Sequence, residues 1–145
     1  MGHRRVAREC ALQMLYERDI GRHAPAEILR SYWTMNDHPK KVRDFAEQLF
    51  TGTLSRVAEI DGVIQDHAKN WRLVRMAAVD RNVLRLAVYE FLSGGNTPNT
   101  VIINEALEIA KKYSTHESAQ FVNGILDSIK NQLHTKGQAD HGRPD

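Results

Sequence analysis

The stretch VDRNVLRLAVYEFL, residues 79–92, decides the fold of this chain of 145 residues. Drawn as a helix, it has apolar side chains on almost every side. The interruptions are Asp80, Arg81, Asn82, Arg85, Tyr89 and Glu90. A helix that is apolar nearly all round is covered by other elements. We therefore expect residues 79–92 to form the central helix of the molecule.

The segments on both sides of this helix also repeat their apolar positions at helical spacing, and no stretch alternates with period two long enough to predict a strand. Further helices are predicted over about 4–18, 25–35, 39–67, 101–113 and 117–133, with a short helical connector over 71–76. The sequence thus predicts an all-α fold of about seven helices. Residues 134–145 have no apolar period, so we expect a disordered tail there.

Length and composition bound the class of protein. Residues 1–133 are enough for one helical domain with a sizeable core. The single cysteine, Cys10, has no partner for an internal disulfide, and neither an export leader nor a membrane span is apparent, so a soluble cytoplasmic protein that does not bind membranes is expected. The net charge of +2 is too small to attract nucleic acid over the whole surface. Any such binding requires a local basic patch.

The chain shows no convincing catalytic, metal or cofactor motif. Its histidines never fall three or four residues apart, so no two share a helix face as a zinc pair would require. Gly94 and Gly95 lie between two predicted helices, which is typical of a connector and not of a phosphate-binding loop. Cys10 lies on an apolar helix stripe and is expected to pack as a small buried residue. We expect a protein that is not an enzyme.

The basic patch that the net charge calls for lies at the start of the first predicted helix. Arg4, Arg5 and Arg8 lie where the helix dipole disfavours cations, and they fall on or beside the polar half of that helix. One interpretation is a solvated polar face. The other is a short arginine-rich motif that binds the phosphates and unpaired bases of RNA. The cost of placing cations at a helix start favours the RNA interpretation.

An apolar and an aromatic residue, Leu12 and Tyr16, also stand on this polar half, one helical turn apart. Solvent would favour charged residues there, so something is expected to cover them. Another helix of the same chain would do so. A protein partner beside the RNA surface is the alternative, because aromatic side chains with a polar tip often anchor interfaces.

Four stretches of the chain are distinctive when taken together: RRVARECALQMLY (4–16), RMAAVDRNVLRLAVYEFL (75–92), VIINEALEIAKKYS (101–114) and FVNGILD (121–127). In their order and spacing they resemble the NusB family of bacterial transcription antitermination factors. The resemblance extends from Arg4 to about Leu133. It implies two stacked three-helix bundles, an N-terminal one over about 3–68 and a C-terminal one over about 71–133.

The resemblance also implies a function without catalysis. NusB proteins pair with NusE, a small-subunit ribosomal protein, and the pair binds the boxA element of nascent ribosomal RNA within the antitermination complex of RNA polymerase. The implied RNA-binding residues are Arg4, Arg5, Arg8, Glu117 and Phe121, and the implied NusE-binding residues are Tyr16 and Asp80, which Leu12 would adjoin. Phe121 also begins the buried stripe of its helix, so a core role for it stays open. The alternative function is a helical homodimer whose arginine-bearing helix is the interface.

Overall fold

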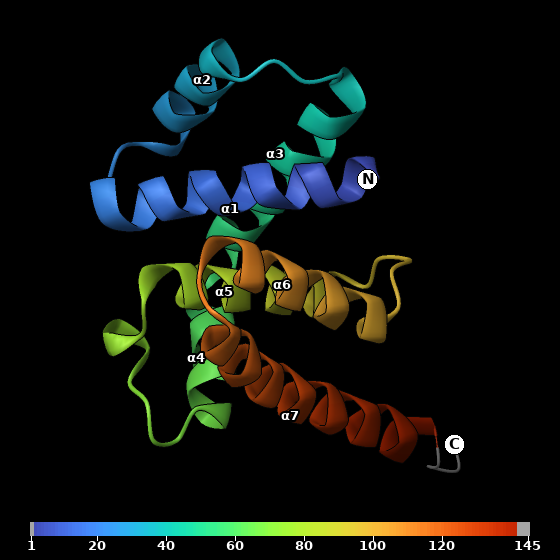
Figure 1. Ribbon diagram of the computed structural model, residues 1–145. Coiled ribbons are helices and arrows are strands. Elements are labelled where there is room, and N and C mark those ends of the chain that lie inside the picture. Colours follow the sequence, from blue (N-terminus) through green and yellow to red (C-terminus); the bar gives the residue numbers. More distant parts are fainter. Residues whose placement is uncertain (1, 142–145) are drawn as a thin grey trace.

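A computed structural model describes residues 2–141 of the chain, and the side chains up to residue 133. Within this part the elements are all helical, as predicted (Figure 1). There are seven α-helices and a 3₁₀-helix, η1, in the described range: α1 His3–Gly21, α2 Pro25–Met35, α3 Lys40–Ser55, α4 Val57–His67, η1 Leu73–Arg75, α5 Ala78–Ser93, α6 Asn99–Tyr113 and α7 His116–His141. Between residues 2 and 141 no helix has both the length and the apolar character needed to cross a membrane.

The buried apolar residues form two clusters. One joins α1, α2 and α3 and contains Phe50 and Met14. The other joins α4 to α7 and contains Ile64 and Leu126. Leu12 of α1 belongs to the second cluster and Leu86 of α5 to the first, so these two helices connect the halves. Helix α4 therefore packs with the C-terminal helices, whereas the resemblance implies an N-terminal bundle that extends to about residue 68.

Helix α5 is central, as its apolar pattern predicts: it contacts α1, α3, α4, α6 and α7. Its polar residues are paired with neighbouring helices. The guanidinium of Arg85 donates to both carboxylate oxygens of Asp61 on α4, at 2.8 and 2.9 Å. That of Arg81 donates to Asp19 on α1 at 2.8 Å. A helix covered on all sides accommodates charged residues only where such partners exist.

The prediction of one long helix over 39–67 is wrong, because the helix is interrupted at Arg56, which has φ −119° and ψ 18°. The break allows α3 to pack in the first cluster and α4 in the second. Apolar spacing did not reveal it, since a single non-helical residue leaves the periods on both sides almost in step. Gly52 of α3 allows a close approach to α5: a Cβ there would lie 2.3 Å from the ring of Tyr89.

The ends of the other helices differ slightly from the predicted ones. The connector predicted over 71–76 contains the 3₁₀-helix η1. Helix α5 ends at Ser93, and the next residue, Gly94, has a φ of +70°, which suits glycine. Helix α7 begins after Thr115, whose hydroxyl accepts a bond from the backbone N–H of Ser118 at 3.0 Å. The backbone of α7 continues to His141 and so extends into the predicted tail 134–145. Helical hydrogen bonds propagate residue by residue past the last buried turn. Residues 142–145 of that tail lie outside the described residues.

Candidate functional site

The N-terminal end of α1 presents two arginines at the surface. Arg4 is exposed, and its guanidinium lies 4.9 Å from the ring centre of Phe45 on α3 and donates to the hydroxyl of Thr97 at 3.1 Å. Arg5 is partly exposed and pairs with Glu105 of α6. Both side chains are therefore held in place by neighbours while part of each cation faces solvent. Such preorganised cations suit an anionic partner.

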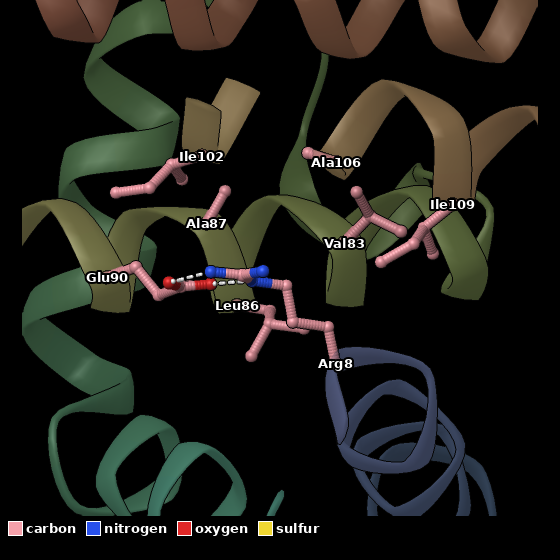
Figure 2. Close-up of a pocket in the computed structure, with 8 residues that line it drawn as sticks. All are labelled: Arg8, Val83, Leu86, Ala87, Glu90, Ile102, Ala106 and Ile109. Carbon is pink, nitrogen blue, oxygen red and sulfur yellow. Dashed lines mark hydrogen bonds and ion pairs between the residues drawn. The ribbon is translucent and has the colours of Figure 1, made fainter. Parts of the chain in front are cut away.

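Arg8 does not share this exposure, which corrects the expectation that all three arginines lie on a solvated face. Only 3% of its side chain is exposed, and it forms a two-pronged ion pair with Glu90 of α5, at 2.7 and 2.8 Å (Figure 2). Apolar residues of α5 and α6 surround the pair. Burial alone would lower the pKa of Arg8, but the hydrogen bonds and charge of Glu90, together with the charge of Glu105, raise it. Arg8 stays charged and joins α1 to α5.

Part of the polar half of α1 faces α6. Along this face the carboxylate of Glu9 accepts from Lys112 at 2.6 Å and from the hydroxyl of Tyr113 at 2.8 Å. The amide of Gln13 donates to the same hydroxyl at 3.1 Å. Together with the pair of Arg5, these bonds tie α1 to α6 over two helical turns. Sequence reasoning missed Glu9 and Lys112 because the two residues are 103 positions apart.

A shallow apolar groove lies farther along the same helix. Its walls are Leu12, Gln13, Tyr16, Val79 and Tyr113. Leu12 is 2% exposed and belongs to the core, so another part of the chain covers it. Tyr16 is 43% exposed at the rim of the groove. The two explanations offered for this pair thus separate: the intramolecular one holds for Leu12, and Tyr16 remains open to a partner.

Asp80 lies next to the groove residue Val79, in the first turn of α5. Its side chain is largely buried, in contrast to an exposed partner-facing carboxylate, and one oxygen accepts from Ser118 at 3.2 Å. The other oxygen has no hydrogen-bond partner among the described residues. Burial raises the pKa of Asp80, while the hydroxyls of Ser118 and Ser114 act in the opposite direction. This second oxygen is buried and Asp80 is not part of the groove wall, so its unused acceptor is out of reach of a partner docked there.

Glu117 and Phe121 lie at the opposite end of α5 from Arg4. Ser118, which follows Glu117, bonds to the first turn of α5, whereas Thr97, which bonds Arg4, follows the last turn. The two ends are about 20 Å apart at 1.5 Å per residue. Glu117 is exposed, and Phe121 is half-buried with its ring edge-on to Trp71 at 5.9 Å. The predicted RNA-binding residues thus form two separate groups.

The described side chains offer no metal centre, since among them no three His, Cys, Asp or Glu residues gather closely enough to hold an ion. The arrangement consists of a cationic helix end, a polar seam between α1 and α6, and an apolar groove. These are surfaces that bind through charge and contact area.

Comparison with known proteins agrees with this description. The chain matches the sequence model of the NusB family over residues 5–131. It is 47% identical over 133 residues to the transcription antitermination protein NusB of Koribacter versatilis, covering 91% of each chain. Its fold is similar to that of T. maritima NusB, with a TM-score of 0.80 and 38% identity over 89% of this chain and 90% of that one. A crystal structure of the antitermination factors NusB and NusE in complex with dsRNA gives a TM-score of 0.83 at 28% identity, covering 91% and 98%.

The fold and these surfaces define a small all-helical binding protein. The chain belongs to the NusB family. Its relative from Koribacter versatilis is named a transcription antitermination protein, and a structural neighbour was crystallised with NusE and RNA.

Proposed function

We propose that this protein is an RNA-binding transcription antitermination factor that acts without catalysis, pairs with NusE and binds boxA of nascent ribosomal RNA. Family membership and the neighbour bound to NusE and dsRNA support the proposal. The observation that carries it on this chain is the end of α1, where Arg4 and Arg5 are held at the surface by Phe45 and Glu105. We further propose that the complex of this protein with NusE joins the antitermination complex of RNA polymerase.

The proposed surfaces divide between two partners. Arg4 and Arg5 contact RNA phosphates, and Arg8 acts indirectly by holding α1 on α5. Glu117 and Phe121 contact a second part of the RNA, beyond the reach of the arginines. The groove bordered by Leu12 and Tyr16 receives NusE, and Asp80, which is buried, acts indirectly by holding the start of α7 on α5 through Ser118. The apolar walls of the groove suit an apolar or aromatic anchor residue of the partner.

The test is the double variant Arg4→Ala with Arg5→Ala, assayed with single-stranded boxA RNA at several salt concentrations. Each phosphate contact adds about 0.7 to the slope of log affinity against log salt. The variant is expected to bind roughly tenfold more weakly, with a slope smaller by about 1.4.

The matched control is Arg30→Ala with Lys130→Ala, which removes the same charge from α2 and α7. It is expected to keep the wild-type slope. If both double variants lower the slope equally, binding depends on net charge alone and the proposed RNA surface is wrong.

A further inference from the structure

A hollow beside Arg4 is not used by the phosphate and NusE contacts described above. It lies between the first turn of α1, the middle of α3 and the loop that joins α5 to α6, at the end of the molecule marked N in Figure 1. Its cavity volume is about 160 Å³. That is less than the about 300–1,000 Å³ of sites that hold a drug-sized ligand, so the hollow suits a group no larger than one planar ring system.

The lining of this hollow is largely polar. Its residues include Arg4, Phe45, Gln48, Ser93, Asn96 and Thr97. The ring of Phe45 forms one wall, with the guanidinium of Arg4 above it. The side-chain amides of Gln48 and Asn96 are exposed, and neither has a hydrogen-bond partner among the described residues. An amide offers both a donor and an acceptor, which is the pattern that recognises the edge of a base.

Charge argues against a phosphate as the occupant. Arg4 is the single cation of the described lining, and Glu90 contributes a carboxylate to the floor. Arg8 neutralises Glu90 through its two hydrogen bonds. The hollow is therefore close to neutral, apart from the cation at its mouth. A neutral, planar group with hydrogen-bonding edges fits it better than an anion does.

The position of the hollow connects it to the RNA. Arg4 lines it and donates to Thr97 on its rim, so a phosphate held by Arg4 would place the adjoining nucleotide at its mouth. Proteins that recognise single-stranded RNA splay bases out of the strand, stack them on aromatic or guanidinium planes and bond their edges. Tyr89 lines the same hollow, and Gly52 leaves room for its ring.

We propose that this hollow receives one unpaired base of the RNA strand whose phosphates Arg4 and Arg5 contact, and that Gln48 and Asn96 bond the edge of that base. The inference rests on the proposed function, because it requires a bound RNA strand. It adds to that function a site that selects for sequence, whereas phosphate contacts only position the strand.

The experiment compares wild type with the double variant Gln48→Ala and Asn96→Ala, using a set of single-stranded boxA RNAs in which one base at a time is removed to leave an abasic sugar. With the intact RNA the variant is expected to bind about tenfold more weakly, the effect of two neutral hydrogen bonds. Its salt slope stays at the wild-type value, since no phosphate contact is lost. With one particular abasic RNA, wild type and variant are expected to bind equally.

Because Gln48 and Asn96 are exposed, the variant is expected to fold normally, and its circular dichroism checks this. Asn70→Ala, which removes an exposed amide elsewhere, is the matched control and should lose no affinity. If the variant binds every RNA as wild type does, or is weaker by the same factor with all of them, no base occupies the hollow. If wild type binds none of the RNAs, the proposed function itself fails.

Discussion

At its N-terminal end α1 carries cations that carboxylates of α5 and α6 hold in place, whereas its C-terminal half borders an apolar groove next to a carboxylate with an unused oxygen. The cations at the N-terminal end have partners within the chain, and only parts of Arg4 and Arg5 face solvent. The C-terminal half leaves the ring of Tyr16 available to a partner, while the unpaired acceptor of Asp80 is buried. One helix thus combines an electrostatic surface with an apolar one.

The contrast is sharpest between Arg4 and Arg8, which are one helical turn apart. Arg4 is exposed and bonds a hydroxyl, while Arg8 is buried against Glu90. An exposed cation contributes little to stability, because water solvates it in both states. A buried cation depends on its partner, because removing one member leaves the other without compensation. Two arginines on one helix therefore have different roles: Arg4 is available to a partner, and Arg8 holds the fold together.

The largest expected effect is on stability, from Arg8→Ala. Loss of the guanidinium leaves Glu90 buried without its partner, so we expect the free energy of unfolding to fall by about 3–5 kcal/mol. Arg4→Ala is expected to change it by less than about 1 kcal/mol. Urea unfolding followed by circular dichroism measures both.

The control for this prediction removes the pair together, as Arg8→Met with Glu90→Leu. Replacing both members of a buried pair by apolar residues is often neutral. The double variant should therefore recover most of the lost stability. A loss below about 1 kcal/mol for Arg8→Ala would show that the pair is dispensable and that the two arginines do not differ as described.

The next effect is on NusE affinity, from Tyr16→Asp. The change places a carboxylate where the proposed interface excludes water, and we expect a loss of about 2–4 kcal/mol in calorimetric titration with NusE. Affinity for RNA alone should change much less. Met35→Asp, at a residue that is 80% exposed on α2, serves as the control. If the two variants bind NusE equally well, the groove is not the surface that binds NusE.

The smallest effect is the pH dependence from Asp80→Asn. Because burial raises the pKa of Asp80, the folded state favours its protonated form. The stability that protonation of Asp80 contributes is fully present below the ordinary aspartate pKa of about 3.9 and is lost as pH rises through the pKa of Asp80 in the folded state. At pH 7 the free energy of unfolding of the variant should exceed that of wild type by about 1 kcal/mol. The difference should shrink as pH falls toward about 4. A variant that is less stable than wild type at pH 7 contradicts this account.

Much of the fold could be predicted from the sequence because helices are local. The apolar period located the helical segments, although it joined α3 and α4 into one, and the nearly all-apolar segment 79–92 identified the central helix. The break at Arg56 could not be found in this way, since both sides keep their period. Within the candidate site, the exposure of Arg4 and Tyr16 agreed with their helix face, whereas the burial of Arg8 did not. The burial of Asp80 differs from the partner-facing role that the resemblance implies.

By itself the sequence determined the helices, the core-facing stripe of each and the resemblance to a family, because these depend on residues close together in the chain. Only the tertiary structure decided which charges are available to partners. Arg8 and Glu90 are 82 residues apart, and Arg5 and Glu105 are 100 apart. The spacing of residues within one helix says nothing about a partner on another. Whether a charged residue binds RNA or holds the fold together depends on that partner.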